Sequence, residues 1–420
     1  MTAAQTQTPA PEKETGAPGP SRWREAFTRI ATGNALVSVL AVIASIIVGS
    51  IMIAATDPDV QAAAGYFFQR PTDTLGAIGS SVGGAYAALF RGAVYNFNAT
   101  SFAIGIRPFT ETLKFATPLI AAGLGVGLAF RAGLFNIGGQ GQMLMAAAAA
   151  GYIATTWDLP FPLHMIAALV AGIIAGAIWG GIAGFLKART GAHEVIVTIM
   201  LNHIAFYLLA WMLATQGVLQ APGSSNPKTA PMADTAVLPQ ILGPMYKLHL
   251  GFLLALVAVA ITWWILERSS LGFRFRAVGE NPAAARTAGI SVGRMYFVVM
   301  IIGGGLVGLA GVSQALGTEP NGFGGGIDAG IGFDAITVAL LGRSRPIGIL
   351  FAGLLFGAFK TGGFTMQASQ GVPIEIVLVV QSLIVLFIAA PPLVRAMFGV
   401  PQPGQAPRRV RRAAKKEVAA

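Results

Sequence analysis

Long runs of uncharged, mostly apolar residues recur along the chain. They cover residues 30–56, 115–130, 132–157, 159–186, 195–215, 248–266, 295–318 and 376–394. Many are long enough for a helix across the ~30 Å hydrocarbon core of a bilayer, which takes roughly 20 residues. A backbone in lipid must satisfy its own hydrogen bonds, and the alternating ten-residue runs of membrane strands are absent. The pattern therefore predicts an all-α, polytopic membrane protein.

About ten membrane-spanning helices are expected from these runs. One further segment, TLGAIGSSVGGAYAALF at 74–90, is uncharged but rich in Gly and Ser. Counting it as a span would invert the charge bias of everything downstream, so we expect an extracellular interfacial helix packed on the bundle. The expected spans are 34–55, 112–131, 134–156, 162–186, 194–215, 250–266, 295–315, 332–342, 346–362 and 374–394.

The distribution of positive charge orients these spans. With the N-terminus inside, 21 of the 28 Lys and Arg residues fall in cytoplasmic segments, as the positive-inside rule requires. We therefore expect a disordered cytoplasmic tail at 1–33, a transmembrane domain at 34–396 and a basic cytoplasmic tail at 397–420. The net charge of +11 could suggest nucleic acid, but the cluster RRVRRAAKK is better explained by contact with anionic membrane lipids.

Two Gly-rich, polar segments interrupt the apolar pattern, one in each half of the chain. GLFNIGGQGQ, residues 133–142, lies early in the expected third span, and NGFGGGIDAGIGFD, residues 321–334, precedes a span of only about a dozen residues. In one interpretation the glycines permit close helix packing and the amides join helices. In the other, irregular backbone and polar groups line a solute path. Because the interruptions are paired, we favour a central solute site between structural repeats.

The candidate residues of this substrate pathway are polar or Gly positions at predicted membrane depth. Asn202 lies about two turns into the fifth span, whereas its neighbour His203 is better explained by contact with another helix. Asp334 opens the short eighth span, where an N-cap and a pathway role are equally plausible. The full set is Asn136, Gly138, Gln140, Gln142, Asn202 and Asp334.

The largest cytoplasmic loop expected between spans is residues 267–294. Within it Asn281 suits an N-cap, Pro282 the first helical position and Gly289 the position after the helix end. The intervening AAARTA predicts a helix of roughly 10 Å whose Ala-rich face suits a groove on another protein. A helix resting on headgroups is disfavoured, because AAARTA has almost no bulky apolar side chain to insert.

Several kinds of chemistry are disfavoured by what the sequence lacks. Cysteine is absent, the four histidines show no metal-ligand spacing, and no GxxxxGK[ST] phosphate loop occurs. No paired carboxylates suggest an active site, so we expect neither an enzyme nor a bound cofactor. Transport would then be driven by a separate ATPase or by an ion gradient, and the scarcity of acids inside the spans weakens the ion-coupled alternative.

Four segments, at 118–147, 187–205, 271–295 and 332–357, carry a family resemblance. They resemble permease subunits of bacterial ABC importers, most closely those of nucleoside transporters. The superfamily also includes ribose/simple-sugar and branched-chain amino-acid permeases. Two positions depart from the family pattern, since Gln140 stands where many relatives have Glu, and His193 where Asn is expected. The segments are PLIAAGLGVGLAFRAGLFNIGGQGQMLMAA (118–147), KARTGAHEVIVTIMLNHIA (187–205), LGFRFRAVGENPAAARTAGISVGRM (271–295) and GFDAITVALLGRSRPIGILFAGLLFG (332–357).

The resemblance implies a type II permease with interrupted helices, located in a bacterial cell membrane. Its implied partners are a second, related permease, an ATPase with tandem nucleotide-binding domains that holds ATP and Mg²⁺, and an extracellular substrate-binding lipoprotein. A ribose or simple-sugar permease and a stand-alone ion-coupled transporter remain alternatives, and purine or pyrimidine preference is open. The residues implied to couple to the ATPase are Glu280, Asn281, Ala284, Ala285, Arg286 and Gly289.

Overall fold

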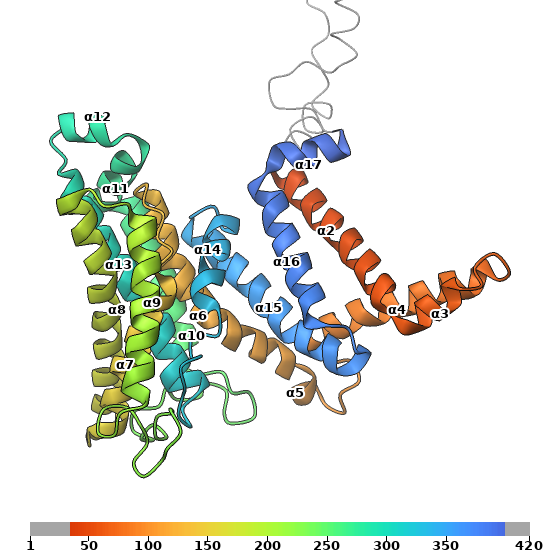
Figure 1. Ribbon diagram of the computed structural model, residues 1–420, viewed down its shortest axis with the longest axis horizontal. Coiled ribbons are helices and arrows are strands. Elements are labelled where there is room, and N and C mark those ends of the chain that lie inside the picture. The colour runs from red at the N-terminus through yellow and green to blue at the C-terminus, as the bar shows by residue number, and fades with distance from the viewer. Residues whose placement is uncertain (1–33, 400–420) are drawn as a thin grey trace, which may run out of the picture. The chain divides into compact units, whose positions relative to one another are not determined.

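The computed structural model describes residues 34–399, and this part of the chain is built from α-helices and one π-helical turn (Figure 1). Residues 45–385 form one compact unit, and the described residues on either side belong to a second. The expected tail 1–33 and most of the tail 397–420 lie outside the described residues. The helices are α2 (Asn34–Thr56), α3 (Pro58–Ala64), α4 (Pro71–Ala93), α5 (Phe102–Gly105), α6 (Arg107–Arg131), α7 (Gly139–Thr156), α8 (Leu163–Thr190), α9 (Glu194–Leu213), α10 (Gly251–Arg268), α11 (Ser270–Glu280), α12 (Pro282–Thr287), α13 (Val292–Ser313), η1 (Gln314–Thr318), α14 (Ile331–Leu341), α15 (Pro346–Gln370), α16 (Ile374–Ala389) and α17 (Pro391–Phe398).

The predicted all-α, polytopic architecture is confirmed, and the expected count of about ten spans is loose. Among the described residues seven helices are long and apolar enough to cross a membrane, or eight if α16 and α17 form one bent span. Two expected spans fail this test for different reasons. Helix α7 has 18 residues but begins with the polar sequence GQGQ, and α14 has only 11 residues. Both shortened helices follow the Gly-rich interruptions.

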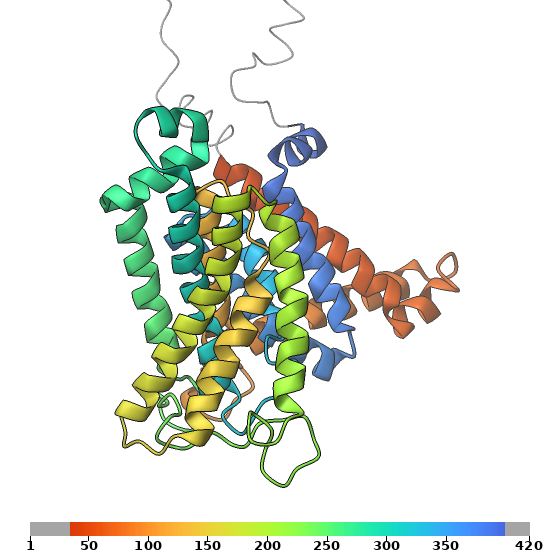
Figure 2. The same cartoon turned by 60° about the vertical axis from the view of Figure 1, so that its left-hand side comes forward.

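Helices α7, α8, α9 and α13 form a bundle that packs through small residues. Figure 2 shows α7, α8 and α9 side by side in yellow and green, and α8 packs most extensively against α13. A Cβ atom at Gly176 would lie 2.6 Å from the backbone oxygen of Gly304, and Gly308 contacts the same turn of α8. Glycine is required here because the two backbones touch, which is how helices gain packing energy in lipid.

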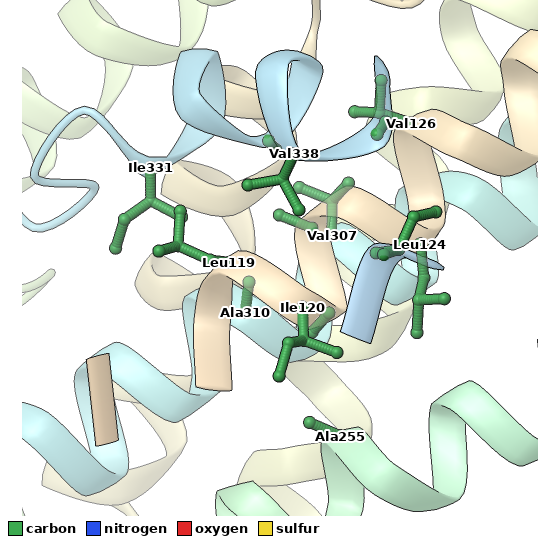
Figure 3. Packing of buried hydrophobic residues seen from close by; sticks show 14 of the residues in the cluster. Leu119, Ile120, Leu124, Val126, Ala255, Val307, Ala310, Ile331 and Val338 are labelled. Atoms are coloured by element: carbon green, nitrogen blue, oxygen red, sulfur yellow. The ribbon is translucent and has the colours of Figure 1, made fainter. Parts of the chain in front are cut away.

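A second group of helices, α6, α14 and α15, shares a hydrophobic core with α13. Figure 3 shows side chains of α6, α13 and α14 converging, among them Leu119, Val307 and Val338, and all three are buried. The hydroxyls of Thr112 on α6 and Thr361 on α15 lie 2.7 Å apart. At the other end of α6, Arg131 Nε donates to the Ser344 oxygen just before α15, at 3.0 Å. Helices α6 and α15 are therefore antiparallel neighbours.

The ambiguous segment 74–90 is part of a longer helix, α4, which is not among the helices apolar enough to span a membrane. It packs against α15, where a Cβ atom at Gly92 would overlap the side chain of Thr365. Ala85 and Ala88 are buried in the same small hydrophobic cluster as Met366 of α15. The expected helix packed on the bundle is thus present, and its depth in the bilayer stays a prediction.

The contact between α8 and α13 can be tested with two neighbouring glycines. A Cβ atom at Gly304 would overlap the backbone oxygen of Gly176, whereas one at Gly305 would lie 3.5 Å from its nearest neighbour, an ordinary contact. We expect Gly304→Ala to cost about 1–3 kcal/mol through overpacking and to lower the melting temperature of the detergent-purified protein. Gly305→Ala is the matched control, and equal melting temperatures for both variants would contradict this packing.

Candidate functional site

The first interruption is an irregular segment, residues 132–138, that ends where α7 begins. Within it Asn136 is fully buried, and its Oδ1 accepts a hydrogen bond from the Gly138 N–H at 2.9 Å. The Gln142 side chain, also buried, donates to the same oxygen at 3.3 Å. The backbone turn before α7 is therefore held by amide groups of its own sequence, in place of the water that a surface turn would use.

The fifth expected span, α9, supplies further partners for this turn. Asn202 Oδ1 accepts from the Gly141 N–H at 2.9 Å, and its Nδ2 donates to the Ile137 oxygen, also at 2.9 Å. Thr198 Oγ1 accepts from the Ile137 N–H at 3.4 Å. Three candidate pathway residues are thus satisfied by protein groups: Asn136 and Gln142 bond within their own turn, and Asn202 joins α9 to it. These bonds favour a structural interpretation of the three amides. A direct role of theirs in transport stays a prediction.

The second interruption ends at the start of α14 and meets the first. Gly330, with φ of +78°, is the N-cap residue of α14, so Asp334 does not cap this helix as one interpretation allowed. A Cβ atom at Gly139 would lie 2.7 Å from the Gly332 oxygen, and one at Gly332 would overlap the backbone of Gln140. The N-terminal ends of α7 and α14 are therefore in direct contact.

This junction lies well inside the transmembrane part of the chain. Helix α14 leads from the junction to the turn containing Ser344, to which the last residue of α6, Arg131, is hydrogen-bonded. An α-helix rises 1.5 Å per residue, so the 11 residues of α14 span about 16 Å. That is about half the ~30 Å thickness of a hydrocarbon core, so with the Arg131 end of α6 at the bilayer surface the two helix N-termini would meet near mid-depth.

Four polar side chains gather at the junction. Gln140, half-buried in the first turn of α7, is hydrogen-bonded to the carboxyl group of Asp328. Lys360 of α15 donates from Nζ to the Ala329 oxygen at 3.3 Å, and its charge acts on the carboxyl groups of both Asp328 and Asp334. Helix N-termini carry partial positive charge, so carboxylates are stabilised there. Together these groups offer donors and acceptors to a bound polar molecule.

Asp328 and Lys360 were not among the residues expected from the sequence. Asp328 sits in a Gly-rich stretch with no periodicity, so nothing in the pattern marked its position at the junction. A usable signal did exist for Lys360, because it is the single charge between Pro346 and Ile374. An isolated ionisable residue inside a membrane span is by default a functional candidate.

The expected helix in the 267–294 loop is confirmed as α12. Asn281 Oδ1 accepts from the N–H groups of Ala283 and Ala284, both at 3.0 Å, and Pro282 is the first helical residue. Gly289 follows the helix end with φ of +81°, a conformation that favours glycine. The short helix therefore forms for the local reasons read from its sequence.

The six residues expected to couple to an ATPase differ in their exposure to solvent. Ala285 is only 4% exposed and packs in a hydrophobic cluster with Phe275 and Val278 of α11, so it anchors α12 and is not available to a partner protein. The other five are exposed: Glu280, Asn281, Ala284, Arg286 and Gly289.

No group of three or more His, Asp and Glu side chains that could hold a metal ion occurs within residues 34–399. The polar junction and the α12 surface are thus the two candidate functional regions of this part of the chain. They differ in kind, since one is enclosed among helices and the other is exposed.

Comparison with known proteins places these features in a family. The family described as "Branched-chain amino acid transport system / permease component" matches residues 109–389. A guanosine ABC transporter permease protein of Bacillus subtilis, NupP, is 39% identical over 325 residues, covering 76% of this chain and 89% of the relative. The residues matched by the family, 109–389, contain both interruptions and α12. No solved structure matches the chain.

Two further relatives differ in the solute that their names give. The nucleoside ABC transporter permease protein NupB of Lactococcus lactis subsp. cremoris is 35% identical over 302 residues, covering 69% of this chain and 81% of the relative. The glucose ABC transporter permease protein TsgB13 of Haloferax volcanii is 35% identical over 292 residues, covering 66% and 75%. The comparisons thus agree on permease subunits of ABC transporters.

The two kinds of amide at the first interruption should respond differently to removal. Asn136→Leu leaves the buried Gly138 N–H and the Gln142 side chain without a partner, and each unsatisfied group costs about 1–3 kcal/mol. We expect Asn136→Leu to reduce the yield of monodisperse protein from membranes, and Gln140→Leu, at a half-buried position, to leave that yield unchanged. Equal yields for the two variants would show that the turn does not depend on Asn136.

Proposed function

The chain belongs to the family of ABC transporter permease components, and we propose that it forms the translocation pathway of an ATP-driven importer for nucleosides. In this family ATP hydrolysis resides on a separate subunit, so the chain is a pathway and not an enzyme. The relatives named for guanosine and for nucleosides support the substrate, at 39% and 35% identity. The glucose permease, at 35% identity, makes a sugar the second candidate.

The observation that carries the proposal is the direct contact between the N-termini of α7 and α14, which we place near mid-depth. Interrupted helices whose N-termini face a central site are a recurrent device for binding solutes within membranes. A nucleoside is neutral and rich in hydrogen-bonding groups, so it can pair with Gln140, Asp328 and Asp334 without the cost of burying a new charge. We assign these residues and Lys360 to the solute pathway, and Asn136, Gly138, Gln142 and Asn202 to the frame that holds it.

The exposed α12 surface supports the proposed contact with an ATPase. Ala284 and Arg286 lie on α12, which Ala285 fixes to α11, and Glu280 is the last residue of α11. Force applied to α12 is thereby transmitted to the bundle. We propose that this loop and both termini are cytoplasmic, and that the ATPase has tandem nucleotide-binding domains holding ATP and Mg²⁺. A second related permease and an extracellular substrate-binding lipoprotein complete the proposed complex in a bacterial cell membrane.

Reversing the charge of Arg286 tests the coupling surface. We expect Arg286→Glu to abolish most solute-stimulated ATPase activity of the reconstituted complex. The reversed charge at position 286 would face groups of the ATPase that match an arginine, and would stay unpaired in the interface. Lys228→Glu, a charge reversal at an exposed lysine in the loop between α9 and α10, is the control and should leave stimulation intact. Normal stimulation and uptake by Arg286→Glu would exclude α12 from docking.

Uptake measurements test the substrate and the pathway together. We expect cells with the assembled importer to take up labelled guanosine, with competition by other nucleosides and none by glucose. Gln140→Leu removes one hydrogen-bonding group, worth about 1–3 kcal/mol, which corresponds to an apparent affinity roughly 5- to 150-fold weaker. Gln367→Leu, at an exposed amide on α15, should transport normally. Competition by glucose and none by nucleosides would favour the sugar permease.

A further inference from the structure

A cavity of about 370 Å³ lies where α4, α6 and α15 meet. Its wall includes Phe115 of α6 and Phe364 of α15, whose ring centroids are 6.3 Å apart with the planes tilted by 50°. Its volume falls in the range of roughly 300–1,000 Å³ that is usual for small-molecule sites. Two aromatic faces at the edge of such a space suit a flat aromatic ligand, because ring stacking stabilises any heteroaromatic base.

Charged and polar groups line the same cavity. Arg107 and Glu111 of α6 contribute to its wall, together with Asn96 from the turn after α4. Glu111 is paired with Lys114, whose Nζ lies 4.8 Å from the centroid of the Phe115 ring. A guanidinium group, a carboxylate and an amide can donate to and accept from hydroxyl groups and base edges. The cavity thus combines the stacking faces and the hydrogen-bonding groups that a nucleoside requires.

Lipid is a poor occupant for this cavity. Another cavity, between α8 and α13, is lined by apolar side chains such as Ile178, Phe185 and Ile301, and it suits an acyl chain. The α4–α6–α15 cavity differs because charged side chains form part of its wall, and acyl chains do not pair with them. The contrast between the two cavities points to a polar, water-borne ligand.

The cavity lies at the end of α6 that is farthest from the coupling loop. Glu111 is 20 residues before Arg131 on one continuous helix, which places it about 30 Å away along the helix axis. Arg131 marks the end of α6 that lies next to the coupling loop, because a Cβ atom at Gly279 of α11 would overlap the Arg131 backbone oxygen. Since we propose that the 267–294 loop is cytoplasmic, the cavity lies at the outer surface, where an importer receives its solute.

Lys360 connects the cavity with the polar junction. Its Nζ lies 5.9 Å from the Phe115 ring centroid and 3.3 Å from the Ala329 oxygen at the second interruption. The side chain thus touches the aromatic wall on one side and the segment before α14 on the other. A solute that leaves the cavity therefore meets the polar groups of the junction about one lysine side chain further on.

We propose that this cavity is the entry site of the pathway, where the base of a nucleoside packs against Phe115 and Phe364 while its polar groups pair with Glu111 and Arg107. The inference rests on the proposed function and adds to it a first binding step and the part of the solute that is recognised. It also predicts that a free nucleobase competes for the site, whereas free ribose does not.

Single-cysteine labelling tests occupancy directly, because the chain has no native cysteine. Ile104 lines the cavity, and Phe102, 73% exposed on the same short helix, does not. In the assembled importer we expect Ile104→Cys to react with a membrane-impermeant maleimide, and guanosine or guanine, but not ribose, to slow the reaction several-fold. Phe102→Cys is the control, and its labelling should not respond to any of the three.

Transport kinetics provide a second test of the entry site. Phe115→Leu and Phe364→Leu remove one stacking face each, and we expect each to raise the KM for guanosine uptake roughly 5- to 100-fold while Vmax and the amount of complex are kept. Phe351→Leu, at an exposed position on α15, should leave KM unchanged. Because leucine is well tolerated in membrane helices, these variants separate binding from folding.

The possible results distinguish the two proposals. An Ile104→Cys site that is unreactive in the complex means that the second permease covers the cavity, and labelling unaffected by guanosine means that the cavity is empty during transport. Either result overturns the entry site, as does a normal KM for both Phe variants. A wild-type importer that takes up sugars and no nucleosides overturns the proposed function, and the entry site with it.

Discussion

Backbone groups at membrane depth must find hydrogen-bond partners within the protein, and the contact between the starts of α7 and α14 depends on this requirement. Both helices begin inside the membrane-spanning region, so their first N–H groups, which lack partners within the helix, need side chains or other protein groups to bond them. Side chains of Asn136 and Asn202 supply partners on one side. Gly139 and Gly332 allow the two backbones to touch. Without both features this junction could not form.

Polar residues near the junction therefore have two different roles that look alike in a sequence. The buried amides stabilise an irregular backbone, and their hydrogen bonds are directed at the protein itself. Gln140, Asp334 and Lys360 are instead partly exposed, so some of their hydrogen-bonding capacity can be offered to a solute, and the buried Asp328 lies beside Gln140. A frame of satisfied amides fixes the geometry, and we propose that the smaller group of Gln140, Asp328, Asp334 and Lys360 recognises the solute. This arrangement is suited to binding a neutral molecule that is rich in donors and acceptors.

Helix α6 links the parts of the molecule that transport would use. Its first turns line the α4–α6–α15 cavity, its middle packs against α13 and α14, and its last residue contacts both α11 and the turn before α15. A continuous helix transmits displacement along its axis better than a loop does. We propose that a movement imposed on α11 and α12 reaches the junction and the cavity through this one element. The buried Ala285 makes the connection from α12 to this system rigid.

Local signals in the sequence determined the fold class, the two interruptions and α12, because apolar run length, glycine content and capping residues act over a few neighbouring positions. The Asn281 cap and Gly289 end are examples that needed no tertiary information. Only the tertiary structure decided which polar residues meet. Asp328 lies 188 positions from its partner Gln140, Asn202 bonds a turn 61 positions away, and Ala285 faces inward despite its polar surroundings. Such pairings depend on how whole helices cross, and no periodicity within one segment contains that information.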